Sequence, residues 1–340
     1  MLSLEFLQIY WWCVVSLLGG LLVFMMFVQG GQTLLFGLCK NELQKDMVIN
    51  SIGRKWELTF TTLVMFGGAC FAAFPLFYAT SFGGAYWVWL AILFCFIVQA
   101  VSYEYRKKPD NFLGARTYEI FLFINGSLGV ILIGMAVSTF FSGSDFLLNE
   151  HNFVQWQTPF RGLEALGNIM LYPLGIAVFF LARVGGALYL INNIDDAELR
   201  ANARKAALKN TILFLPFFLA FAAWVLSKPG FGYDEAGEVS VVAFKYARNF
   251  ADMPIIAVTA VAGVCGVLFG VFKGAFTKSI YGIVPFGAGV VLVVTALFLI
   301  SGLNGTAFYP SFSVLQSSLT IKNASSSRYT LNVMFYVSFL

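Results

Sequence analysis

Charged residues are scarce in this sequence. Asp, Glu, Lys and Arg together make up 11% of its 340 residues, while hydrophobic residues make up 59%. A typical soluble domain carries about 25% charged residues. So little charge beside so much apolar surface excludes an ordinary water-soluble domain.

Histidine is rarer still, since His151 is the only one in the chain. Haem in a membrane bundle is usually held by His, Met, Cys or Tyr side chains from facing helices. His151 lies between two apolar segments, so no intramembrane histidine is present to ligate a haem. The nine methionines are isolated apolar side chains, and we interpret them as filler of the core.

Metal and nucleophile motifs are also missing. The five cysteines show no CxxC spacing, and we interpret them as buried free thiols. No cluster of His, Cys and carboxylate residues has the spacing of metal ligands, and neither a phosphate-binding loop nor a nucleophile elbow is present. We therefore predict no metal site, no catalytic residue in this chain and no binding to nucleic acid.

Long apolar runs dominate the chain. They lie at about residues 6–38, 57–82, 84–103, 117–142, 163–192, 210–227, 253–276 and 279–302. A membrane-spanning helix needs about 20 mostly apolar residues, and these runs lack the alternation of barrel strands. We predict an all-α, polytopic membrane bundle of about nine transmembrane helices, forming one domain over residues 1–340. The ninth run opens near Tyr329 with only about a dozen residues left, so it is either truncated or does not cross.

Lys and Arg are distributed unevenly between the two alternating sets of loops. Fourteen lie in one set: Lys40, Lys45, Arg54, Lys55, Arg106, Lys107, Lys108, Arg116, Arg200, Arg204, Lys205, Lys209, Lys273 and Lys278. Six lie in the other set: Arg161, Lys228, Lys245, Arg248, Lys322 and Arg328. Because cytoplasmic loops carry the excess of Lys and Arg, we predict that the first set is cytoplasmic and the N-terminus is outside.

Three blocks of sequence stand out in order along the chain. Residues 50–75 contain NSI, then WE, then GGACFAAFP; residues 103–106 read YEYR; residues 318–334 contain SLT and later SSSRYTLNVM. These blocks resemble the NSI…WD…GGALFAAWP, FDYR and SLT…ATSSQLTVNVM runs of subunit II of bacterial cytochrome bd-type (cyanide-insensitive) quinol oxidases. They keep that family's order and span nearly the whole chain, so we treat the resemblance as specific.

The resemblance implies a haem-free subunit. In that family the three haems and the quinol-oxidising site belong to subunit I, and the enzyme reduces oxygen to water with protons from the cytoplasm. This chain is then expected in a bacterial inner membrane beside a haem-bearing subunit I. The resemblance also allows a small single-helix subunit, membrane lipid, quinol and a bound quinone as partners. It favours truncation of the ninth helix, which continues in the family.

Trp56 and Glu57 are the candidate functional residues. They follow Arg54 and Lys55 at the start of an apolar run, which places Glu57 at the cytoplasmic mouth of a membrane helix. Ionisable groups in membrane helices often mark proton relays. A glutamate in the first turn also complements the helix dipole, which stabilises a helix by about 0.3 to 1 kcal/mol. The residues alone favour a role in complementing the helix dipole. The resemblance favours a role in proton transfer, because the family has an aspartate at this position and assigns it to a proton pathway.

The sequence departs from the family at several positions. Thr62 stands where the family has a tryptophan, and Gln29–Gln32, which reads QGGQ, stands where the family often has DGFD. Amides hydrogen-bond across helices but do not titrate. Glu104 keeps the acid of the FDYR block with one more methylene, and Glu119 is explained first by the dipole of the helix it begins.

Two other functions are consistent with this composition. A secondary transporter also has many helices and few charges, although transporters tend to show repeated halves with helices broken at matching positions. Prolines interrupt several runs here without matched flanking sequence. A purely structural assembly subunit with no role in proton transfer is the third interpretation.

Overall fold

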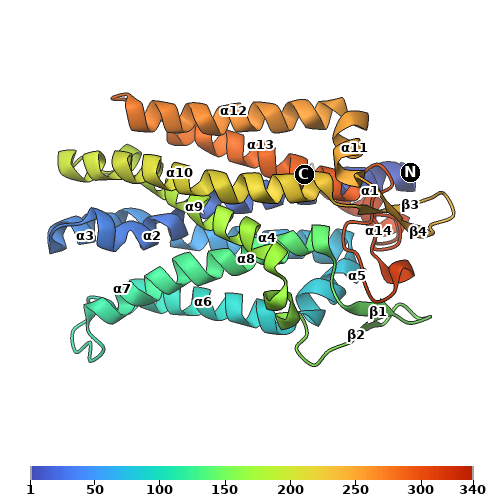
Figure 1. Ribbon diagram of the computed structural model, residues 1–340. Coiled ribbons are helices and arrows are strands. Elements are labelled where there is room, and N and C mark those ends of the chain that lie inside the picture. The colour runs from blue at the N-terminus through green and yellow to red at the C-terminus, as the bar shows by residue number, and fades with distance from the viewer. Residues whose placement is uncertain (1, 339–340) are drawn as a thin grey trace.

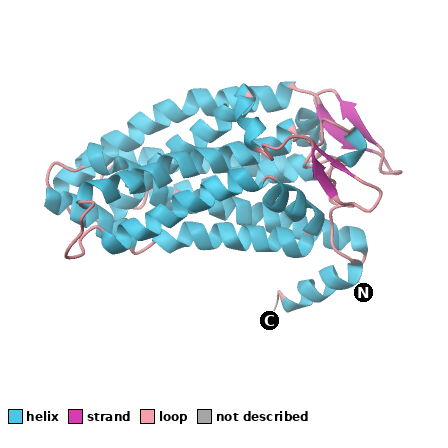
Figure 2. Ribbon diagram, turned by 90° about the horizontal axis from the view of Figure 1, so that it is seen from below, coloured by secondary structure: helices cyan, strands magenta, loops and turns pink. Residues whose placement is uncertain are grey.

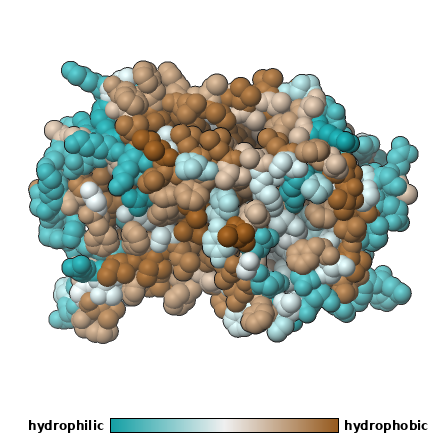
Figure 3. All heavy atoms as spheres, viewed as in Figure 1, coloured by the Kyte–Doolittle hydropathy of each residue, from teal (hydrophilic) through white to brown (hydrophobic). Residues whose placement is uncertain are grey.

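The computed structural model describes residues 2–338, whose main helices lie side by side along one common direction (Figure 1). Among these residues, eight helical stretches are long and apolar enough to cross a membrane. The space-filling view shows a largely apolar belt between two more hydrophilic ends (Figure 3). The predicted all-helical membrane bundle is therefore confirmed.

Several of the eight spans are built from more than one helical segment. In chain order they are α1 (Leu4–Met25) with α2 (Phe27–Leu38), α3 (Glu42–Gly53) with α4 (Trp56–Ala73), α6 (Tyr86–Tyr105), α7 (Ala115–Ile124) with the π-helix η2 (Asn125–Gly129) and α8 (Val130–Ser142), the 3₁₀ turn η4 (Ile169–Leu171) with α9 (Tyr172–Asn193), α10 (Ala197–Ser227), α12 (Pro254–Phe276) and α13 (Ile283–Gly302).

The remaining elements are short. They are α5 (Pro75–Tyr78), the π-helix η1 (Ala79–Gly84), β1 (Phe146–Leu148), β2 (Val154–Trp156), the 3₁₀ helix η3 (Leu163–Gly167), β3 (Gly230–Tyr233), β4 (Val239–Val242), α11 (Lys245–Asp252), the 3₁₀ turn η5 (Leu315–Ser317) and α14 (Arg328–Val337). Strand β1 pairs antiparallel with β2, and β3 pairs antiparallel with β4.

Two spans extend well beyond their apolar runs. The second begins at Glu42 and the sixth at Ala197, because polar residues continue each helix past the apolar stretch. Both starts are capped: the side chain of Asn41 accepts a hydrogen bond from a first-turn backbone N–H, and Asp196 does the same. The two extensions contact each other, because Nε2 of Gln44 donates a 2.9 Å hydrogen bond to the Glu198 carboxylate.

The ninth predicted span corresponds to α14, which has 10 residues within the part of the chain that the structure describes. That length is too short to cross a membrane. The helix packs against α1, where the indole Nε1 of Trp11 donates a 3.2 Å hydrogen bond to the carbonyl oxygen of Leu331. Residues 339–340 lie outside the described range, and α14 is not among the eight candidate spans of the described residues.

The two ends of the bundle differ in kind. Both strand pairs and the N-terminus lie at one end, which we call the hairpin end (Figures 1 and 2). The turns from α2 to α3, α6 to α7, α9 to α10 and α12 to α13 lie at the opposite end, on the left of Figure 1. The fourteen clustered cations belong to these turns and the helix segments beside them, and we call this the cation-rich end.

Glycines let α2 and α9 approach closely. A Cβ atom on Gly30 would lie 1.8 Å from the carbonyl oxygen of Ala182, and one on Gly186 would lie 2.3 Å from the backbone nitrogen of Gly31. Small residues at helix crossings are the usual way for membrane helices to bring their backbones together. This crossing fixes the position of α2, which carries the predicted amides Gln29 and Gln32.

Candidate functional site

The junction of α3 and α4 carries both predicted site residues. Helix α3 ends at Gly53, and α4 begins at Trp56 after two exposed cations. Glu57 lies in the first turn of α4 with an exposed side chain. Within residues 2–338 its carboxylate makes no hydrogen bond or ion pair.

Trp56 lies over the side chain of Tyr103, which comes from α6. Their rings stack with centroids 6.3 Å apart and planes inclined by 27°. The two rings line an open groove together with Arg54 and Glu104. The volume of this groove is about 360 Å³. Glu57 follows Trp56 in the chain but is not among the groove's lining residues.

Polar contacts lead inward from this groove. The Tyr103 hydroxyl accepts a 3.0 Å hydrogen bond from Nε2 of Gln32, which is fully buried on α2. One turn earlier on α2, Oε1 of buried Gln29 accepts a 2.8 Å hydrogen bond from the Thr59 hydroxyl on α4. The expectation that these amides bond across helices is met. Sequence reasoning missed Tyr103, although it opens the YEYR block.

An ion cluster fixes the cation-rich end beside the junction. The Arg106 guanidinium lies 2.6 Å from the Glu119 carboxylate and 2.8 Å from that of Asp46, and Lys45 lies 3.3 Å from Glu119. Arg106 is 5% exposed and Glu119 only 1%. Glu119 was expected to complement the dipole of α7, but its main interaction is this buried pair. The cluster ties α3, α6 and α7 together and so holds the junction in place.

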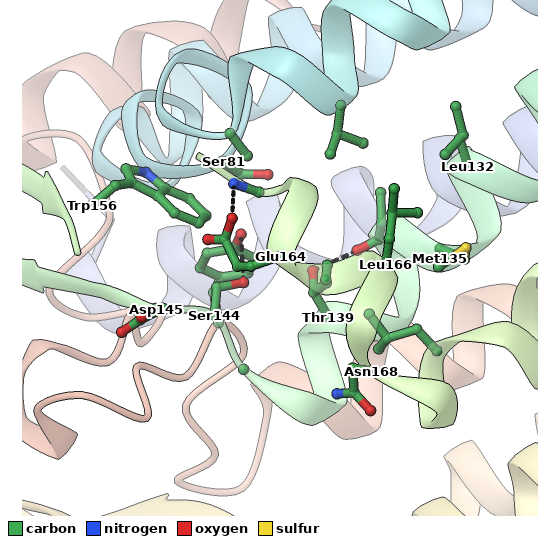
Figure 4. Close-up of a pocket in the computed structure, with 18 of the residues that line it drawn as sticks. Ser81, Leu132, Met135, Thr139, Ser144, Asp145, Trp156, Glu164, Leu166 and Asn168 are labelled. Atoms are coloured by element: carbon green, nitrogen blue, oxygen red, sulfur yellow. Dashed lines mark hydrogen bonds between the residues drawn. The ribbon is translucent and has the colours of Figure 1, made fainter. Parts of the chain in front are cut away.

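A second polar site lies near the hairpin end (Figure 4). A cavity there has a volume of about 90 Å³ and is lined in part by apolar side chains such as Leu132. Oε2 of Glu164 accepts a 2.8 Å hydrogen bond from the backbone N–H of Gly162, while Oε1 is buried without a protein partner among residues 2–338. Burial raises the pKa of the Tyr309 phenol, which accepts a 3.1 Å hydrogen bond from Ser144. The volume and polarity suit several ordered water molecules.

The arrangement of the possible metal-ligating side chains can be described for residues 2–338. Among residues 2–338, no group of three or more His, Cys, Asp and Glu side chains is placed to hold a metal ion. The cysteines are free thiols, as expected, but Cys13 and Cys265 are exposed rather than buried. These two lie on the outer faces of membrane helices, where an exposed thiol behaves as a small apolar side chain.

Comparison with known proteins decides the family. The family model for cytochrome bd terminal oxidase subunit II matches residues 7–340. The chain belongs to this family. Membership makes it one subunit of an oxidoreductase complex and implies a subunit I as its partner. It also removes the secondary transporter from consideration.

Relatives of this bd oxidase subunit II cover nearly its whole length. A probable cytochrome oxidase subunit 2 from Haemophilus influenzae is 29% identical over 98% of this chain and 90% of its own. The cytochrome bd-I ubiquinol oxidase subunit 2 of Escherichia coli K12 is 27% identical over 99% and 91%. The cytochrome bd ubiquinol oxidase subunit 2 of Bacillus subtilis is 28% identical over 86% and 79%.

A solved structure supports the fold. The bd oxidase from Geobacillus thermodenitrificans includes a chain that matches this one with a TM-score of 0.66 and 14% identity. The match covers 98% of this chain and 94% of that one. At this identity the likeness supports the fold alone, which is that of a bd oxidase membrane bundle.

Proposed function

We propose that this chain is the haem-free subunit II of a bd-type quinol oxidase and helps to deliver protons from the cytoplasm to its partner. The Escherichia coli relative is a ubiquinol oxidase subunit by name, which supports quinol as the electron donor. The observation that carries the proton role is the exposed, unpaired Glu57 carboxylate beside the groove at Trp56 and Tyr103. That groove leads to the buried amide of Gln32.

The residues of this chain do not fit a histidine-ligated haem. His151 is exposed between β1 and β2, with its ring beside Phe153, and the chain has no second histidine. We therefore assign the haems and the reduction of oxygen to subunit I. The contribution of this chain is to hold that partner and to move protons.

Proton transfer at the junction follows from the chemistry of its groups. An exposed carboxylate exchanges protons rapidly with water, and Glu57 places one where α4 begins. The groove beside Trp56 is wide enough for water molecules, which pass protons by exchanging hydrogen bonds. The Tyr103 hydroxyl and the Gln32 amide extend the polar contacts into the bundle. Trp56 shapes the groove and does not itself titrate.

The orientation is part of the proposal. With the cation-rich end in the cytoplasm of a bacterium, Glu57 faces the compartment that supplies the protons and the N-terminus lies outside. Residues 1–340 form one transmembrane domain in this account. Quinol, lipid and a small single-helix subunit are further partners, and a quinone is a possible ligand of the complex.

Three variants in the assembled oxidase test Glu57. Glu57→Gln keeps the shape but removes the titratable group, so we expect slower oxygen reduction at full haem content. Glu57→Asp restores the family's acid and should retain much of the rate. Asp195→Asn removes another exposed carboxylate at the same end and serves as the control. Wild-type turnover in Glu57→Gln with full haem content would leave Glu57 a structural residue that complements the helix dipole.

A further inference from the structure

A group of buried amides lies one to two helical turns inward from the Tyr103 hydroxyl. Gln99 on α6 and Asn125 in η2 are both 0% exposed, and neither end of either amide has a protein partner among residues 2–338. Nε2 of Gln29 and Oε1 of Gln32 are also buried without a partner there. Buried polar atoms in native proteins are nearly always hydrogen-bonded, so six orphan atoms in one region call for an explanation.

The helix registers bring these amides together. A Cβ atom on Gly129 would lie 3.2 Å from Cβ of Cys95 and 3.6 Å from Nδ2 of Asn125. Because α6 and the α7–η2 segment run antiparallel, Asn125, one turn before Gly129, lies level with Gln99, one turn after Cys95. Gln99 is in turn one helical turn from Tyr103, whose hydroxyl bonds to Gln32.

Buried Asn125 is the first residue of a π-helical turn. Residues 125–129 interrupt the α-helical path between α7 and α8, and π-helical turns of this kind occur frequently at functional sites. Gly126 allows the same turn to press against α2, where a Cβ atom would lie 2.3 Å from the carbonyl oxygen of Gln29. The cluster therefore joins three separate segments of the chain.

The chemistry of the orphan atoms indicates what they bind. Three are donors, namely the amide nitrogens of Gln29, Gln99 and Asn125, and three are acceptors, namely the amide oxygens of Gln32, Gln99 and Asn125. A cation would satisfy only the oxygens, and an anion only the nitrogens. Water both donates and accepts, so it satisfies the whole set.

We infer that Gln29, Gln32, Gln99 and Asn125 hold a cluster of ordered water inside the membrane, and that this cluster carries protons inward from the Tyr103 groove. This inference rests on the proposed role in proton delivery. Each water in such a cluster accepts a proton on its oxygen and passes a different one onward, so charge moves without net movement of water. The neutral amides orient the waters and do not titrate.

Gln99 offers a matched pair of substitutions in the assembled oxidase. Gln99→Leu has a similar volume but cannot bind water, and we expect oxygen reduction at full haem content to slow by about tenfold, with a larger solvent deuterium isotope effect. Gln99→Ser leaves a hydroxyl and room for a further water, so it should keep most of the rate. Asn125→Leu should slow turnover like Gln99→Leu, and the double variant should be no slower than either.

Two controls separate water binding from packing. Cys95→Ala changes the same face of α6 one turn away and should leave the rate unchanged. The melting temperature of Gln99→Leu should fall below that of Gln99→Ser, because leucine leaves the bound water and the other amides with one hydrogen-bonding partner fewer. A high-resolution cryo-electron microscopy map of the wild-type complex should show water between Gln99 and Asn125.

The outcomes are distinct from those for Glu57. A map in which the Gln99 and Asn125 amides bond directly to each other, with no water, would overturn the inference. Wild-type turnover in Gln99→Leu would overturn the proton-carrying role even if water is present. If Glu57→Gln has wild-type turnover but Gln99→Leu is slow, the proposed role of Glu57 fails while the water cluster stands.

Discussion

Charged residues at the cation-rich end illustrate how far single residues can be interpreted from sequence. Glu57 was predicted at the mouth of a membrane helix, and in the structure it lies in the first turn of α4 with an exposed side chain. Glu119 follows the same pattern, an acid near the start of a helix, yet it is 1% exposed and paired with Arg106. Sequence position alone cannot distinguish the two, because Arg106 belongs to another element.

The buried pair gives a prediction at this scale. Glu119→Gln leaves the Arg106 guanidinium buried with one fewer counter-charge, which should lower the free energy of unfolding by about 3 kcal/mol. Glu104→Gln is the control, because Glu104 and its partner Lys108 are both exposed and such pairs contribute about 0 to 1 kcal/mol. Thermal melting of the assembled oxidase measures both. Equal melting temperatures for the two variants would contradict a stabilising role for the buried cluster.

At the scale of elements, the apolar runs predicted the eight spans. The structure of the polar stretches between these runs could not be predicted in the same way. Nothing in the sequence distinguishes the helical polar stretch of α3 from a loop until its N-cap at Asn41 is recognised. The π-helix at Asn125 is still harder to predict, because no residue type in the sequence marks the wider turn. The groove and the amide cluster depend on these two features, and so the sequence predicted only part of the site.

The crossing of α2 and α9 gives the prediction at this scale. Gly30→Ala and Gly186→Ala place a methyl group against backbone atoms, so each should lower stability by about 1 to 3 kcal/mol through forced separation of the helices. Gly68→Ala on α4 meets nothing within 4 Å and should be close to neutral. The yield and melting temperature of the purified complex compare them. A neutral Gly30→Ala would show that the helices are less tightly packed than the structure indicates.

For the whole molecule, the loop charges predicted a two-ended arrangement that the structure bears out, since the fourteen cations gather opposite the β hairpins. Which end faces the cytoplasm is a separate question. A reporter inserted between Arg106 and Arg116 should be active in the cytoplasm, and one inserted near His151 should be active outside. The reverse pattern would place Glu57 on the wrong side of the membrane to take up cytoplasmic protons.

The central claim is that this chain supports an oxidase without carrying a redox centre of its own. It belongs to the bd oxidase subunit II family over residues 7–340, and its one histidine lies outside the membrane helices. We propose that the subunit acts by holding a haem-bearing partner and supplying it with protons.

The most direct test is the haem absorption spectrum of this chain, purified by an affinity tag from membranes with and without subunit I. The account predicts haem bands and quinol oxidase activity only when subunit I copurifies, and no haem bands from the chain alone. A haem spectrum from the isolated chain would contradict it.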